Sequence, residues 1–202
     1  MSYDVFDGDT ATFVVPVPLE AHHAGGPAWF EATVSGQDKG IQLVARDLGG
    51  VEVGRAEGRL RGDLEIEATI TGPQGEVRIT LAPASPPTAG GGKVDLRGTI
   101  NGQAFTIAAS GEESDASAAA GRVELAPTES QLMKDWATVG HPLTVIAQAM
   151  QIRETGSCAG CITSGVGEAV LAAACVDGAL PACGALLITW PTFVDHCTGA
   201  CA

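Results

Sequence analysis

The six cysteines of this 202-residue chain all lie in its C-terminal quarter, because none precedes Cys158. Charge divides at the same place. Every lysine and arginine precedes Cys158, and from that residue onwards the charged side chains are Glu168, Asp177 and Asp195. Two independent features therefore place a boundary near residues 154–157, and they predict two unlike parts in one chain.

The spacing of the cysteines predicts a helical hairpin. Cys161 and Cys175 are 14 residues apart, and so are Cys183 and Cys197. Fourteen residues are close to four turns of an α-helix, so each pair lies on one helix face. Pro181 suits the first turn of the second helix. An antiparallel hairpin would join the cysteines as nested pairs: Cys175 with Cys183 at the turn, Cys161 with Cys197, and Cys158 with Cys201 outside them.

Other uses of the cysteines stay open at this point. Six cysteines allow 15 connectivities, and Pro191 is expected to break or kink the second helix. Cys158-Ala-Gly-Cys161 has the spacing of a zinc knuckle, which His196, Cys197 or Cys201 could complete. A zinc site would leave Cys175 and Cys183 unused, and a thioredoxin-like site would need a βαβ context. The sequence therefore favours disulfides, with neither a metal site nor a cofactor, in a secreted or cell-surface protein.

The predicted hairpin is very apolar for its size. Two helices cannot bury all of its large side chains against each other, so the surplus is expected to face the N-terminal part, a second copy or a membrane. This predicted apolar contact surface consists of Val166, Val170, Leu186, Leu187, Ile188, Trp190 and Phe193.

Residues 1–127 read as an acidic β-rich domain. Apolar and polar residues alternate over short segments, and Asn101-Gly102 suits the type I′ turn of a hairpin. Together with the tail, this part predicts an α+β protein with an N-terminal antiparallel β-sandwich or barrel. The predicted strands are residues 12–17, 29–34, 41–46, 51–59, 64–70, 77–81, 94–100, 104–108 and 122–125.

Residues 128–157 are predicted to form a helical connector, followed by the cysteine-rich hairpin over residues 158–202. Thr128 and Gln131 fit a capping box at the start of a first helix. Gly140 and Pro142 are expected to end that helix, with Pro142 as the first residue of a second one. The apolar stripes of the two helices are expected to pack on the β-rich domain or on the tail.

The sequence contains no motif for catalysis. It shows no nucleophile motif, phosphate-binding loop or convincing catalytic carboxylate pair, so we expect neither an enzyme nor a small-molecule substrate. His22 and His23 are adjacent, but no third metal ligand lies nearby. The formal net charge of −13 makes nucleic acid a poor partner for the whole chain. The N-terminus opens acidic, without the basic region of a signal peptide, so the export route is not visible in the sequence.

Three short segments of the tail resemble the halocin-C-eight-like bacteriocin family. They are Cys183-Gly-Ala-Leu-Leu-Ile-Thr-Trp-Pro191, Cys158-Ala-Gly-Cys161 and Ala-Ala-Cys175, and the resemblance covers about the last 45 residues. In that family an apolar, cysteine-rich peptide is cut from the C-terminal end of a precursor, whose N-terminal part is thought to serve as the immunity protein.

The resemblance implies a bacteriocin-like precursor, cut near Gly156-Ser157. Its tail would be an antimicrobial peptide that enters a competitor's membrane, and its N-terminal domain would shield or neutralise that tail. The alternative is a non-catalytic structural or interaction protein that uses the stapled hairpin as a permanent assembly surface. Membrane binding and self-association are accordingly the partnerships that the sequence predicts.

Overall fold

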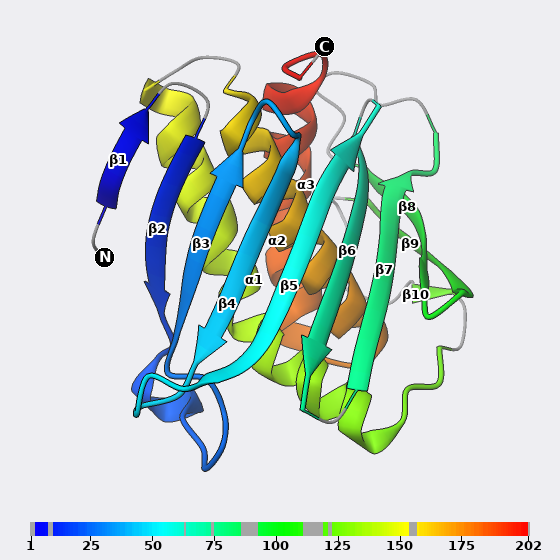
Figure 1. Ribbon diagram of the computed structural model, residues 1–202. Coiled ribbons are helices and arrows are strands. Elements are labelled where there is room, and N and C mark those ends of the chain that lie inside the picture. The colour runs from blue at the N-terminus through cyan, green and yellow to red at the C-terminus, as the bar shows by residue number, and fades with distance from the viewer. Residues whose placement is uncertain are drawn as a thin grey trace.

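The computed structural model describes residues 3–7, 10–62, 64–73, 75–85, 93–110, 119–120, 123–153 and 157–201. Within these ranges ten strands form one antiparallel sheet whose spatial order is the order of the chain. Three helices cover one face of the sheet (Figure 1). The strands are β1 Tyr3–Asp7, β2 Thr10–Pro16, β3 Trp29–Ser35, β4 Gly40–Arg46, β5 Glu52–Arg61, β6 Glu65–Gly72, β7 Gly75–Pro83, β8 Lys93–Ile100, β9 Gln103–Ser110 and β10 Ala119–Ala120. The helices are α1 Pro127–Arg153, α2 Cys158–Val176 and α3 Leu180–Cys197, and a 3-10 turn spans Leu19–Ala21.

The structure confirms the predicted fold class: an antiparallel β-region, then helices, of which the last two are stapled by disulfides. The layer that faces the sheet is made of helices (Figure 1). Strand alternation specifies one apolar face for each strand, but it does not specify what covers that face. Here α1 and α2 contact the inner face between β2 and β7, and α3 contacts β8.

The β8–β9 hairpin has the predicted turn. Asn101 and Gly102 both have positive φ, 50° and 79°, as a type I′ turn requires. The predicted strand over residues 122–125 is wrong for its described part, since residues 123–125 have no regular structure. The Gln103 side chain instead bonds both backbone groups of Glu124, donating to its carbonyl and accepting from its N–H, each at 3.0 Å. Those two bonds replace a strand pairing.

The prediction of two connector helices is wrong, because α1 runs unbroken through Pro142. It begins one residue before the predicted cap: Pro127 is its first residue, and the Glu129 carboxylate accepts a hydrogen bond from the Ala126 N–H at 2.8 Å. Buried residues lie on both sides of the proline, so tertiary packing outweighs the lost backbone bond. Helix α3 likewise continues through Pro191, where the sequence predicts a break or a kink, so the expected break is absent.

One hydrophobic core joins the three predicted segments, 1–127, 128–157 and 158–202. Apolar residues of the inner sheet face, of α1 and of α2 belong to the same cluster. Phe30 of β3 and Trp136 of α1 meet edge to face, with their ring centroids 4.8 Å apart. The helices thus form the second layer of a two-layer core rather than a separate module.

Candidate functional site

Helix α2 is the central helix of the protein, because it contacts β3–β7 of the sheet and both of the other helices, which lie with it behind the sheet in Figure 1. Its N-cap is Ser157, whose hydroxyl accepts a hydrogen bond from the Gly160 N–H at 3.2 Å. By length and composition alone it could cross a membrane, yet 94% of its apolar 18-residue stretch is buried inside this protein. The rest of the chain therefore covers an apolar helix of membrane-spanning length.

Three disulfides close the α2–α3 hairpin in nested order. Cys158 joins Cys201, Cys161 joins Cys197, and Cys175 joins Cys183, with Cα–Cα distances of 4.9, 5.4 and 4.6 Å. All three lie within residues 158–201, so no disulfide connects the tail to the part that precedes it. The continuous α3 keeps Cys197 in register with Cys161 despite Pro191. Intramolecular disulfides of this kind are consistent with an oxidising compartment.

Helices α1 and α2 approach each other closely through glycines. A Cβ on Gly167 would lie 2.8 Å from the carbonyl oxygen of Gly140, and one on Gly140 would lie 2.9 Å from Leu171 Cγ. Hydrogen in place of a side chain therefore sets the separation of the two backbones. Gln151, near the end of α1, donates to the Ser157 carbonyl and to Cys161 Sγ, each at 2.9 Å. Helix α1 therefore contacts the stapled tail closely at two places, around Gly140 and around Gln151.

The inner face of the sheet is shaped to receive α2. A Cβ on Gly58, in the middle of β5, would overlap the Cγ2 atom of Val166. Close by, a Cβ on Gly165 of α2 would lie 3.0 Å from Ile66 of β6. Val166 of the helix thus packs over Gly58 of the sheet, and Ile66 of the sheet packs over Gly165 of the helix. We call α1 and the inner face of β3–β7 the hairpin seat.

The predicted apolar contact residues divide into a buried and an outer set. Those of α2, together with Leu186, Trp190 and Phe193 of α3, are buried, and the rings of Trp190 and Phe193 contact each other at a tilt of 49°, with centroids 5.2 Å apart. Leu187 is half-buried against the core, whereas Ile188 is 75% exposed. The surplus apolar surface of the hairpin therefore faces mainly its own chain, and the outer side of α3 faces solvent.

Glu168, in the middle of α2, is fully buried at 0% exposure. Neither of its carboxyl oxygens has a hydrogen bond of good geometry, although the Thr189 hydroxyl lies close enough to influence the group. Burial raises the pKa of this carboxyl well above its ordinary value, and the Thr189 hydroxyl of α3 offsets only part of the shift. The folded protein therefore holds Glu168 as a neutral acid at pH values where an exposed glutamate is ionised. Its buried place lay beyond sequence reasoning, although a single acid in an apolar helix was a visible signal.

The paired histidines serve separate structural contacts. His22 Nε2 lies 3.0 Å from the Val17 carbonyl, and His23 Nε2 lies 2.8 Å from Asp135 Oδ1 of α1. The hydrogen bond to Asp135, and then its negative charge, raise the pKa of His23. His23, Asp135 and Trp136 belong to the lining of a cleft of about 610 Å³ between α1 and the end of the sheet. The described residues contain no group of three or more potential ligands placed to hold a metal ion.

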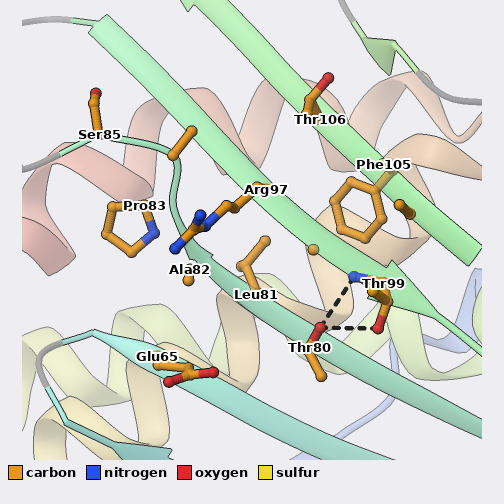
Figure 2. A pocket seen from close by; sticks show the side chains of 13 residues that line it. Glu65, Thr80, Leu81, Ala82, Pro83, Ser85, Arg97, Thr99, Phe105 and Thr106 are labelled. Atoms are coloured by element: carbon orange, nitrogen blue, oxygen red, sulfur yellow. Dashed lines mark hydrogen bonds between the residues drawn. The ribbon is translucent and has the colours of Figure 1, made fainter. Parts of the chain in front are cut away.

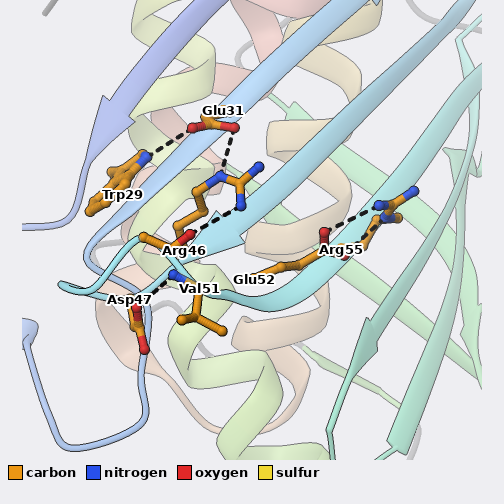
Figure 3. Close-up of polar contacts among 8 residues, drawn as sticks. Trp29, Glu31, Arg46, Asp47, Val51, Glu52 and Arg55 are labelled. Carbon is orange, nitrogen blue, oxygen red and sulfur yellow. Dashed lines mark hydrogen bonds and ion pairs between the residues drawn. The ribbon is translucent and has the colours of Figure 1, made fainter.

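The outer face of the sheet carries solvated polar contacts. Glu31 of β3 accepts hydrogen bonds from Trp29 Nε1 and Arg46 Nε, at 3.2 and 2.8 Å, and the bonds to Arg46 and Trp29 lower the pKa of Glu31 (Figure 3). Over β7–β9 lies an open groove of about 700 Å³, where the hydroxyls of Thr80 and Thr99 bond each other at 2.9 Å (Figure 2). An ion pair as accessible to solvent as Glu31–Arg46 contributes little to stability.

No family model, curated protein or solved structure matches the chain.

Proposed function

We propose that this protein is a bacteriocin-like precursor, in which the stapled α2–α3 hairpin is a membrane-active peptide and the preceding part holds it in a shielded form. The observation that carries the proposal is the burial of α2. This helix is apolar and long enough to cross a membrane, yet 94% of its apolar 18-residue stretch is buried by the protein's own chain.

The covalent organisation supports release as a unit. The three disulfides tie α2 to α3, and none ties the hairpin to α1 or to the sheet. One cut in residues 154–156, which lie outside the described residues, would leave two pieces held only by noncovalent packing. The released hairpin would keep its staples and would expose the apolar side chains that the seat covers. Secretion follows from this proposal, since the target membrane belongs to another cell.

The experiment compares one preparation before and after a single cut. A specific protease site replaces residues 154–156 in the oxidised full chain, and a control variant carries the same residues in scrambled order. Protease-treated and untreated samples of both are added to dye-loaded vesicles and to related strains. We expect dye release and growth inhibition only when the cleavable chain is cut and the tail is freed from its seat with mild denaturant, followed by dilution. Freed, oxidised tail that neither perturbs vesicles nor inhibits any strain would overturn the proposal.

An assembly role is the second candidate, and one observation favours it. Ile188 and Leu180, on the outer side of α3, are 75% and 70% exposed. In that case the uncut protein would form concentration-dependent oligomers, which sedimentation velocity would detect. Replacing Ile188 by aspartate would abolish them. A monomer at all concentrations would leave the precursor function as the one to pursue.

A further inference from the structure

Glu168 is the one buried ionisable side chain among the residues whose burial is described. The other buried polar side chains are Thr144, Gln151, Thr163, Ser164 and Thr189, and none of these ionises in the ordinary pH range. Thr189 cannot fully satisfy the carboxyl, because its hydroxyl donates to the Ala185 carbonyl at 2.9 Å. An unpartnered carboxyl in an apolar core is destabilising in its charged form and tolerable only in its neutral form.

Among the side chains whose burial is described, no charged group of the surrounding elements lies in the core beside it. On α3, Asp195 and His196 are exposed. The titratable groups of α1 whose burial is described, Glu129, Lys134, Asp135 and His141, are exposed or half-buried rather than buried. Those of β3–β7 alternate with the inner apolar residues and lie on the outer face; they are Glu31, Arg46, Glu52, Arg55, Glu57, Arg59, Arg61, Glu65, Glu67, Glu76 and Arg78. The protonation state of Glu168 therefore depends on the cover around α2, to which α1, α3 and the inner face of the sheet all contribute.

We propose that Glu168 is a proton-binding site that links release of the hairpin from its seat to pH, an inference that rests on the proposed function. The seated hairpin carries the neutral acid. A hairpin that leaves the seat loses the cover of the sheet and of α1 while it keeps α3, and water that then reaches the carboxyl takes up its proton. Release and loss of one proton are thus a single linked equilibrium, and a rise in pH drives it towards the free hairpin.

The sign and the size follow from proton linkage. Below the ordinary carboxyl pKa of 4.5 both forms are protonated, so release does not depend on this group. Between that value and the raised pKa of the seated form, release sets one proton free, and its equilibrium constant rises about tenfold for each pH unit. Above the raised pKa both forms are ionised and the constant levels off. The seat is therefore strongest in acid and weakens towards neutral pH.

The test uses the full chain with the cleavable site in residues 154–156, cut once while folded. Urea is raised until half of the wild-type tail separates on size exclusion at about pH 4.5, and the pH is then increased in steps. We expect the wild-type release constant to rise about tenfold per unit over part of this range. Glu168→Gln, which is neutral at every pH and similar in shape, should show no such rise. Asp195→Asn removes an exposed carboxylate from the same hairpin and should keep the wild-type profile.

Equal pH profiles for wild type and Glu168→Gln would overturn the proposal. A second measurement keeps it open to refutation if the variant does not fold: the carbon chemical shift of the Glu168 carboxyl, followed by NMR in the intact wild-type chain. A titration midpoint at the ordinary value would refute it. No membrane is present in either experiment, so a tail that is inactive on vesicles would count against the proposed function and leave the proton linkage standing.

Discussion

Gly58 of β5 is the position where one added carbon should most directly test the contact between the sheet and the tail. A Cβ there would overlap Val166 Cγ2 and would lie 3.1 Å from Ile41 Cγ2. Val166 cannot swing aside easily, because a β-branched side chain in a helix has one strongly preferred rotamer. We therefore expect Gly58→Ala to force the sheet and α2 apart.

The expected cost can be worked out from the two sides of the contact. Overpacking a well-filled core lowers the free energy of unfolding by about 1–3 kcal/mol. Val166→Ala removes two buried methyl groups, at ~0.8 kcal/mol each, and leaves a small cavity, so it should cost about 2 kcal/mol. In the double variant the new methyl group occupies the space that the valine vacates. Its cost should fall short of the sum of the single variants by about 1–3 kcal/mol.

Guanidinium unfolding of the four oxidised proteins measures this coupling, and Gly40→Ala serves as the matched control. Gly40 also lies in a strand, but a Cβ there would meet nothing closer than 3.5 Å, at the Gly58 carbonyl. The control should therefore be neutral or slightly stabilising. Costs for Gly58→Ala and Val166→Ala that add within about 0.5 kcal/mol would refute the contact. So would a Gly58→Ala variant as stable as the control.

Four further outcomes are expected. Gly184→Ala should add about 0.5–1 kcal/mol to the free energy of unfolding, because Gly184 lies in a helix and a methyl group there meets open space. Gly102→Ala should remove about 1 kcal/mol from it, because φ is 79° at Gly102 and a side chain is strained in that conformation. Replacing Cys175 and Cys183 by alanine should cost about 2.5 kcal/mol, as expected for a disulfide across a separation of 8 residues, and an unchanged denaturation midpoint would contradict this. The raised pKa of His23 means that its contribution is complete below its ordinary value of 6.5 and is lost as the pH rises through the folded value. Wild-type stability should accordingly fall over that range more than that of His23→Asn, and parallel profiles would count against the ion pair.

Local patterns in the sequence predicted much of the fold. Alternation located β2 to β9, because side chains in a strand point in turn to opposite faces. Equal spacing within the two helices located the hairpin, since residues four turns apart share a face. The prediction of a helix break at Pro142 was wrong, because a local rule for proline ignores the packing of α1 against α2 on both sides of that residue. Gly140 is a contact point for Gly167 rather than a helix end.

The seat itself could not be predicted. Gly58 and Val166 lie far apart in the sequence, and neither residue alone indicates that one receives the other. The same holds for Glu168: its charge was visible, but its burial depends on the sheet, on α1 and on α3 together. Sequence periodicity identifies which face of an element is apolar, whereas the pairing of two apolar faces is a property of the whole chain.

The order of the strands has a consequence for synthesis. Because each strand pairs with its neighbours in the chain, each hairpin can form as soon as its two strands have left the ribosome. The apolar inner face must then wait, since α1, α2 and α3 are translated after the strands. Until the helices are synthesised, the nascent sheet exposes a broad apolar surface that is prone to aggregation. The tail is then the late piece that completes the protein, and oxidation of its cysteines is the step that closes it.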